Sequence, residues 1–154
     1  MKNWLYYEDD GALTPLDEMV DFEKSFGFVY KTINLKTGKF YIGKKTFLHN
    51  KKKKLTKKEL AVMPVTRGRT ATTKIEQVDS GWKDYYGSSK ELLSDIKTYG
   101  KENFKRIILD FCDTKKQLTY YEIYHQMTHR VLFVDSYNDN IQGKFYRKDF
   151  ATQE

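Results

Sequence analysis

Two short runs of aromatic and β-branched residues in the first third of the chain predict a pair of strands. They occupy residues 27–34 and 39–43, and such side chains suit the half-buried surface of a sheet. The segment between them, NLKTG, carries a glycine near its end, as hairpin connections often do. A third run, NFKRIILDFC over 103–112, predicts a mostly buried strand.

Apolar residues at helical spacing follow in the middle of the chain. The sequence Ser88-x-x-Glu91 has the form of a capping box, and Leu92 and Ile96 lie four positions apart. A glycine, a natural helix end, follows this pattern. These signals predict a helix over 89–99.

A further helix is predicted to begin at Thr114-x-x-Gln117, which is another capping box. Residues 131–138 either continue this helix or form a strand, and the pattern leaves both open. Near the start of the chain, a threonine-proline pair followed by two acids predicts a short helix over about 15–24. One face of the helix after Thr114 carries Leu118, Tyr121, Glu122 and His125.

These elements predict an α+β fold with a small antiparallel sheet flanked by helices. We divide the chain into an N-terminal extension (1–26), a domain (27–143) and a C-terminal tail (144–154), with an insert at 44–80 inside the domain. No apolar run is long enough to span a membrane, and one cysteine cannot form an internal disulfide. The first residues do not resemble a signal peptide, so we expect a cytoplasmic protein.

Positive charge gathers in the insert. Residues 44–74 hold eleven lysines and arginines against one acid, whereas the rest of the chain is slightly acidic. The insert is too polar to form a core, so we expect a long loop, with one brief helix opened by Thr56-x-x-Glu59 and ended by Pro64. A local basic block indicates contact with a polyanion such as nucleic acid, although a solvated basic loop without a partner gives the same pattern.

Few residues carry chemistry by pattern alone. Glu122 shares a helical face with apolar residues, and buried carboxylates are rare unless they are paired or bind metal. Periodicity by itself favours a solvated helix edge for Glu122. His125 and His129 are spaced for zinc, but no HExxH motif or cysteine set supports such a site. Phosphate-loop and acyl-transfer motifs are missing from the sequence.

The interpretation of the two tyrosines in the predicted hairpin depends on the sequence around them. By themselves, Tyr30 and Tyr41 are typical of cross-strand packing. The stretch "GFVY…FYIGKK" resembles the signature of the GIY-YIG nucleases, with FVY in place of GIY. The segments "GSSKELLSDIKTYGKENFKRIILDFC", "TYYEIYHQ" and "SYNDNI" resemble later parts of that family. The resemblance covers roughly 27–140 and is greatest to the phage-borne branch, which includes homing-type nucleases.

This resemblance implies a three-stranded antiparallel sheet and a set of site residues. Tyr30 would be the general base, provided that a nearby cation lowers its pKa from about 10. Tyr41 would orient water or phosphate, and Gly43 would let the substrate approach closely. Glu122 would bind a single Mg²⁺ or Mn²⁺ ion, which needs few protein ligands. Asn138 would hold structure or orient Glu122.

The family's active-site arginine has no clear counterpart here. Counting from the YIG glycine places Lys51 at that position, inside the basic insert. Three alternatives remain open: Lys51 itself, an arginine folding back from the insert, or a lysine at the strand end. We favour Lys45 together with Arg69. The residues expected to bind DNA are Lys44, Lys51, Lys52, Lys53, Lys54 and Arg67.

The resemblance therefore implies a divalent-metal-dependent DNA endonuclease. The alternative is a nucleic-acid-binding module of the same fold with weak or no activity, and a third candidate is a protein-interaction role for the acidic N-terminal extension. The chain has little room for a separate DNA-recognition domain. We therefore expect low intrinsic sequence specificity, or a dimer or partner protein that supplies it.

Overall fold

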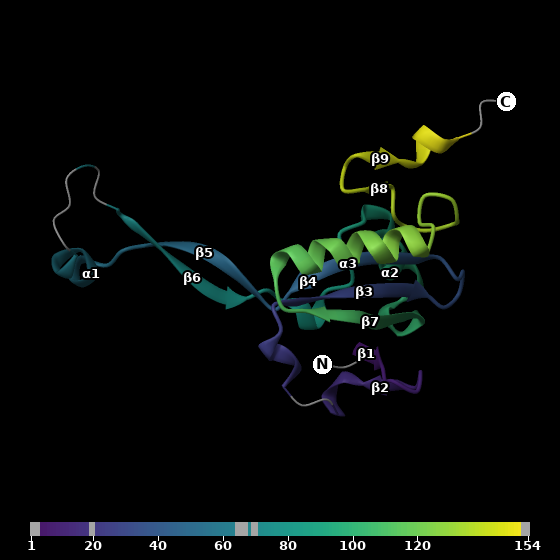
Figure 1. Ribbon diagram of the computed structural model, residues 1–154, viewed down its shortest axis with the longest axis horizontal. Helices are drawn as coiled ribbons and strands as arrows, with labels where there is room; N and C mark the ends of the chain where they lie inside the picture. The colour runs from purple at the N-terminus through teal and green to yellow at the C-terminus, as the bar shows by residue number, and fades with distance from the viewer. Residues whose placement is uncertain (1–3, 19–20, 64–67, 69–70, 152–154) are drawn as a thin grey trace.

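The computed structural model describes residues 4–18, 21–63, 68 and 71–151. Its main sheet has five strands in the order β2-β1-β7-β3-β4 (Figure 1). Strand β3 (Gly27–Asn34) lies between β4 (Phe40–Thr46) and β7 (Phe104–Cys112) and is antiparallel to both. The α+β class and the three strands predicted from sequence are confirmed.

The start of the chain adds two strands that were not predicted. β1 (Trp4–Tyr7) pairs in parallel with β7, and β2 (Leu13–Pro15) pairs with β1. The sheet is therefore mixed and larger than the antiparallel three-stranded sheet that we expected. The predicted helix over 15–24 is wrong: among its described residues, Pro15 ends β2, and 3₁₀ turns follow at Leu16–Glu18 and Phe22–Lys24.

Burial of the Trp4 side chain in the core holds the N-terminal strands on the sheet. This side chain is buried and packs edge-on against Phe28 and Tyr30, with ring centroids 5.1 and 5.7 Å apart. Such edge-to-face contacts add to the stabilisation gained by burying a large ring. The guanidinium carbon of Arg106 on β7 lies 4.4 Å from the ring centroid of Trp4 and 4.1 Å from that of Tyr86, so Arg106 makes cation–π contacts with both rings. The stretch predicted to be an extension thus forms one edge of the sheet.

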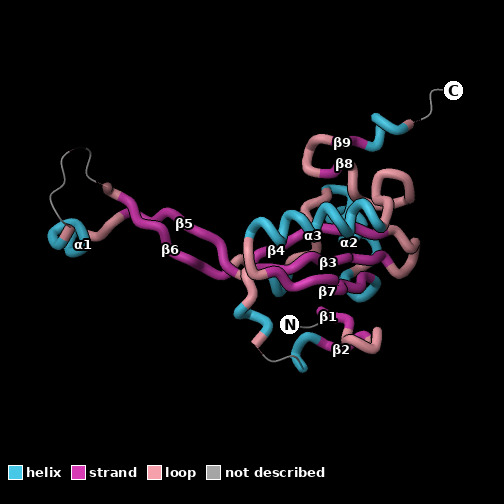
Figure 2. The backbone as a smooth tube through the Cα atoms, in the orientation of Figure 1, coloured by secondary structure: helices cyan, strands magenta, loops and turns pink. Residues whose placement is uncertain are grey.

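Two helices pack against the sheet (Figure 2). α3 (Lys115–Thr128) begins at its predicted cap, Thr114, and buries Leu118 against Val29 and Ile42 on one face of the sheet. α2 (Lys90–Tyr99) buries Leu92 and Ile96. Its cap is Ser89 rather than the predicted Ser88, because the Ser89 hydroxyl accepts the hydrogen bond from the Leu92 amide.

The basic insert is not the loop that we expected. β5 (Leu48–Lys54) and β6 (Thr73–Asp79) form an antiparallel two-stranded ribbon that extends away from the main sheet (Figures 1 and 2). The loop prediction was based on low hydrophobicity, which excludes a hydrophobic core. A two-stranded ribbon has no core either, so low hydrophobicity does not exclude it. The brief helix is confirmed as α1 (Lys57–Val62), with Thr56 as its cap. Pro64, which was predicted to end it, lies outside the described residues.

The segment after α3 is neither helix nor strand over 131–138, so neither of the predicted alternatives is formed. Two short strands follow it, β8 (Asn140–Ile141) and β9 (Phe145–Tyr146). Arg147 then folds back, and its guanidinium donates hydrogen bonds to the carbonyls of Val131, Val134 and Asn138. Among the described helices, none is long and apolar enough to cross a membrane.

Candidate nuclease site

The two tyrosines of the hairpin share one face of the sheet. The register pairs Tyr30 with Gly43 and Thr32 with Tyr41, so the tyrosines are diagonal neighbours on adjacent strands. Their ring centroids are 6.2 Å apart. The strand pairing alone therefore brings together the two side chains that the sequence signature singles out.

The Tyr30 hydroxyl is buried without compensation. The side chain is fully buried, and within the described part of the chain its hydroxyl has no hydrogen-bond partner. Burial raises the pKa of Tyr30 well above its ordinary value, and the nearby Tyr41, Tyr85 and Glu122 raise it further. Buried polar groups are nearly always paired, so an unpaired phenol at this position requires an explanation.

Gly43 is required by these phenols. A β-carbon at this position would lie 2.7 Å from the Tyr30 hydroxyl oxygen and 2.7 Å from the Tyr41 ring. Both distances are far below van der Waals contact, so only glycine fits without displacing a ring. The glycine of the YIG triplet thus allows the two tyrosines to converge.

Glu122 reaches the same region from α3. Its carboxylate is buried, with 8% of the residue exposed. The Gln142 side-chain amide donates a 2.6 Å hydrogen bond to Glu122 Oε1, and Lys44 Nζ lies 3.8 Å from that oxygen. Burial raises the pKa of Glu122, while Lys44 and Gln142 oppose the rise. The solvated helix edge favoured by periodicity alone is therefore wrong, and Glu122 faces inward.

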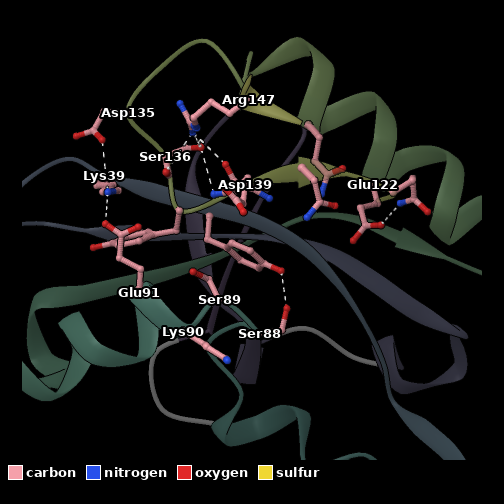
Figure 3. A pocket seen from close by; sticks show the side chains of 16 residues that line it. Lys39, Ser88, Ser89, Lys90, Glu91, Glu122, Asp135, Ser136, Asp139 and Arg147 are labelled. Atoms are coloured by element: carbon pink, nitrogen blue, oxygen red, sulfur yellow. Dashed lines mark hydrogen bonds and ion pairs between the residues drawn. The ribbon is translucent and has the colours of Figure 1, made fainter. Parts of the chain in front are cut away.

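These groups meet at the free edge of the sheet. β4 is an edge strand, and α3 covers the face opposite to the tyrosines. Tyr41 and Glu122 both line a pocket of about 840 Å³ that opens at this edge. The Tyr41 hydroxyl pairs with the Ser88 hydroxyl, 2.8 Å away. Figure 3 shows Ser88 and Glu122 on different sides of the pocket. Burial raises the pKa of Tyr41, the bond with Ser88 opposes the rise, and the charges of Tyr85 and Glu122 add to it.

Asn138 holds the edge strand in place. Its side-chain oxygen accepts a 2.9 Å hydrogen bond from the Ile42 amide, and its side-chain nitrogen donates a 2.8 Å bond to the Ile42 carbonyl. The carboxamide thus pairs with β4 as a neighbouring strand would. Gln126 also donates to the Ile42 carbonyl. No hydrogen bond between Asn138 and Glu122 is present among the described residues, and Gln142 contacts that carboxylate instead.

The cations proposed to replace the arginine lie in different places. Lys44 Nζ donates to the Thr119 hydroxyl, 2.9 Å away, and is the lysine beside Glu122. Lys45 Nζ instead lies over the Tyr85 ring, 4.2 Å from its centroid, and burial lowers its pKa. Lys51 is on the projecting ribbon. Arg67 and Arg69 lie outside the described residues.

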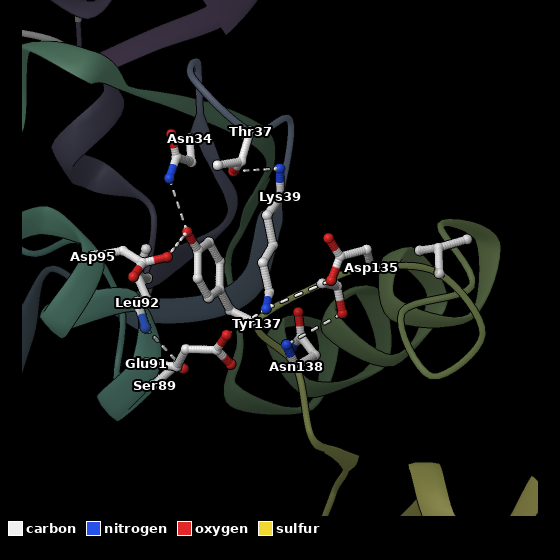
Figure 4. A network of polar contacts seen from close by, with 12 residues as sticks. Asn34, Thr37, Lys39, Ser89, Glu91, Leu92, Asp95, Asp135, Tyr137 and Asn138 are labelled. Atoms are coloured by element: carbon white, nitrogen blue, oxygen red, sulfur yellow. Dashed lines mark hydrogen bonds and ion pairs between the residues drawn. The ribbon is translucent and has the colours of Figure 1, made fainter. Parts of the chain in front are cut away.

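A polar network fixes the wall of the pocket (Figure 4). The Tyr137 hydroxyl donates a 2.7 Å hydrogen bond to Asp95 on α2 and accepts one from the Asn34 side chain. Burial, together with Asp95, raises the pKa of Tyr137 to about 12, so the phenol stays neutral. Lys39 pairs with Glu91 and also with Asp135, 3.5 Å away. These contacts join α2, the hairpin and the segment after α3.

The donor groups fit a magnesium-type site better than a zinc site. The described residues contain no cluster of three histidine, cysteine or acidic side chains. His125 is paired with Asp110, and His129 contacts the carbonyl of His125, so the spaced histidines are otherwise engaged. Mg²⁺ and Mn²⁺ accept one carboxylate with waters and phosphate oxygens completing the shell.

Sequence reasoning missed several residues that complete the site. Gln142 gives no sequence signal, because its contact with Glu122 depends on a turn in which Gln142 has a φ of 55°. Ser88 was assigned to the helix cap, although its hydroxyl serves Tyr41 instead. Tyr85 packs edge-on against Tyr30 with ring centroids 6.0 Å apart, and Gln126 supports β4. Tyr85 lies just before the segment GSSKELLSDIK that resembles the family, so the resemblance does not single it out.

A comparison with known protein families covers nearly the whole chain, including the site. The family model described as "Putative endonuclease segE, GIY-YIG domain" matches residues 12–149. The chain belongs to this GIY-YIG family. The match extends from β2 to beyond β9 and includes every site residue described above. No curated protein and no solved structure gives a significant match. Metal dependence and the roles of single residues stay predictions.

Proposed function

We propose that this GIY-YIG protein is a divalent-metal-dependent DNA endonuclease that hydrolyses phosphodiester bonds in the pocket at the edge of β4. One observation carries the proposal: two buried groups with unfavourable environments lie within electrostatic reach of each other. The Tyr30 hydroxyl has no partner among the described residues, and burial raises the pKa of the Glu122 carboxylate. Residues that reduce stability in this way are typical of functional sites.

Glu122 is the residue that would hold the metal ion. Among the acidic side chains that line this polar pocket it is the buried one, and one carboxylate suits an ion whose other ligands are waters and phosphate oxygens. A divalent ion bound there would act as a Lewis acid. It would also offset the charge of Glu122, which adds to the rise that burial causes in the pKa of both tyrosines.

The side chains of this chain divide the remaining work. We assign Tyr30 as the general base; burial holds its pKa well above the ordinary value, so this role requires a bound cation that lowers it. Tyr41 is a neutral phenol at the pocket wall and orients the phosphate or the attacking water. Lys44 lies beside Glu122 and stabilises the negative charge that develops on the phosphoryl group. Gln142 holds the carboxylate in position.

Nicking of supercoiled plasmid tests this function. The wild-type protein is incubated with plasmid and Mg²⁺, with EDTA as the metal control, beside the variant Glu122→Gln. Glutamine keeps the size of the side chain and can still accept the bond from Gln142, so the fold should persist. We expect nicking by the wild type with Mg²⁺ only, and loss of nicking in the variant.

A second acidic residue of the same pocket provides the matched control. Glu91 lines the pocket but is more than half exposed and paired with Lys39. We expect Glu91→Gln to nick at close to the wild-type rate. Equal nicking by wild type and Glu122→Gln would refute the proposed site. No nicking by a folded wild type that still binds DNA would favour the binding module without activity.

A further inference from the structure

We propose that one face of the β5–β6 ribbon enters the major groove of duplex DNA and reads base pairs with Asn50 and Gln77. This proposal rests on the proposed function only in taking DNA as the substrate. Sequence reasoning expected the insert to bind phosphates without sequence preference. The ribbon instead presents two chemically different faces, and only one of them is suited to a groove.

The strand register separates these faces. Asn50 pairs with Gln77, Lys52 with Ile75 and Lys54 with Thr73 across the ribbon. Side chains alternate between faces along a strand, so these residues share one face. We call this the open face of the ribbon; it is formed by Asn50, Lys52, Lys54, Thr73, Ile75 and Gln77. The opposite face, called the ion-paired face, is formed by Lys51, Lys53, Lys74 and Glu76.

Ion pairs occupy the ion-paired face. Lys53 lies 3.7 Å from Glu76, and Lys74 lies 3.4 Å from Glu76 and 2.8 Å from Glu59 on α1. The β6 residues on this face are half-buried, whereas those on the open face are exposed. Among the described residues, Lys52 and Lys54 of the open face make no ion pair, and on the opposite face Lys51 makes none while Lys53 and Lys74 do. The charges of Lys52 and Lys54 remain available to phosphates.

The open face has the chemistry that reads bases. Asparagine and glutamine amides match the donor and acceptor of adenine in the major groove, and apolar side chains contact the thymine methyl group. Asn50 and Gln77 lie opposite each other, and Ile75, next to them on this face, is 65% exposed. The exposed Ile75 side chain makes no favourable contact with water. In the major groove it would contact the methyl group of a thymine.

The dimensions of the ribbon suit this groove. Each strand has seven residues. At about 3.4 Å per residue such a strand spans about 24 Å, and paired strands lie about 4.8 Å apart. The major groove is about 12 Å wide and admits a two-stranded ribbon. At about 3.4 Å per base pair, this length corresponds to about seven base pairs.

The open face also leads toward the proposed active site. Asn50 and Gln77 line a hollow of about 670 Å³ together with Lys44, Lys45 and Lys115. Lys44 Nζ is 3.8 Å from the Glu122 carboxylate, so this hollow borders the site. The acid at the base of the open face, Asp79, accepts a hydrogen bond from the Gly81 amide. A duplex whose backbone lies in the hollow would therefore meet the open face.

Binding to a fluorescently labelled duplex of 30 base pairs, measured by anisotropy in EDTA across a salt series, tests the face assignment. The variants are Lys52→Ala/Lys54→Ala on the open face and Lys53→Ala/Lys74→Ala on the ion-paired face, where each lysine pairs with an acid. Both variants remove two positive charges from the ribbon. Each lost phosphate contact lowers the slope of log K against log salt by about 0.9. We expect a fall of about 2 for the open-face variant and a much smaller fall for the other.

Base reading is tested by selecting preferred sequences from a randomised duplex pool. We expect the wild type to enrich a short motif and Asn50→Ala/Gln77→Ala to lose it with an unchanged salt slope. A good bidentate contact discriminates by about 1–3 kcal/mol, or about 5- to 150-fold. Equal effects of the two lysine pairs, or no enriched motif in the wild type, would overturn the proposal.

Plasmid nicking with Mg²⁺ separates this proposal from the proposed function. Wild-type nicking with indistinguishable binding by both lysine variants would reject the ribbon proposal and leave the endonuclease standing. Binding that depends on the open face, without nicking, would do the reverse.

Discussion

Replacing Tyr30 with phenylalanine should stabilise the protein and abolish nicking at the same time. The substitution removes one oxygen and keeps the ring that packs against Trp4, Phe28 and Tyr41. That oxygen is fully buried and has no partner among the described residues. Active sites often keep residues that lower the stability of the fold because the reaction requires them, and replacing such a residue can stabilise the protein.

The expected size of the effect follows from the environment of the hydroxyl. A buried polar group without a hydrogen bond costs about 1–3 kcal/mol, and phenylalanine removes this cost. For a domain of this length, each kcal/mol raises the melting temperature by about 2–4 °C. Tyr41→Phe is the matched control, since its hydroxyl is paired with Ser88. We expect that variant to lose about 0.5–1.5 kcal/mol, the usual net worth of a hydrogen bond.

Urea unfolding followed by tryptophan fluorescence measures both variants, because Trp4 and Trp82 lie in the same core cluster as Tyr30. Nicking is measured on the same preparations. If Tyr30→Phe were destabilised as much as Tyr41→Phe, the Tyr30 hydroxyl would have a partner in solution. If it were stabilised and still nicked at the wild-type rate, Tyr30 would not be the base. Either result would refute the reasoning.

Three further predictions concern the neighbouring residues. Asn138→Ala leaves the Ile42 amide unpaired, so we expect a loss of about 1–3 kcal/mol in urea unfolding; an unchanged midpoint with lost nicking would instead give Asn138 a chemical role. Gly43→Ala places a carbon 2.7 Å from the Tyr30 oxygen and should cost about 1–3 kcal/mol as overpacking, contradicted by an unshifted melting curve. Without metal, Glu122→Gln should raise stability at neutral pH. The raised pKa of Glu122 means that the folded state disfavours the carboxylate, so the gain should vanish as the pH falls below about 4, the range of an unfolded glutamate; a gain that is independent of pH would contradict this.

The elements predicted correctly from sequence are those with a local signal. β3, β4 and β7 carry runs of β-branched and aromatic residues, and α3 begins at the threonine that caps it. β1 is also rich in aromatic residues (WLYY), but it has only four residues and pairs with a strand about a hundred positions later. Its conformation depends on this pairing with β7 and on the packing of Trp4 against Phe28 and Tyr30 of β3. Such contacts are not visible in a local pattern.

The ribbon shows a different reason for failure. Four consecutive lysines give no alternation of polar and apolar residues, so β5 cannot be recognised by its hydrophobic period. Its partner β6 does alternate in exposure, yet TKIEQVD has too few apolar residues to stand out. The strands form through backbone pairing with each other. Their lysines therefore give no signal of a buried core.

The missing arginine illustrates both points. Counting forward from Gly43 assumes a helix after the second strand, and in this chain the count runs onto the ribbon and ends at Lys51. The two lysines that directly follow Gly43 stay on β4 and, by strand alternation, point to opposite faces. Lys44 lies beside Glu122 on the α3 face, and Lys45 stacks on Tyr85 on the tyrosine face. Of the two, Lys44 is therefore the one placed to act together with Glu122, and we propose it, rather than the Lys45 favoured from sequence, for the role of the arginine.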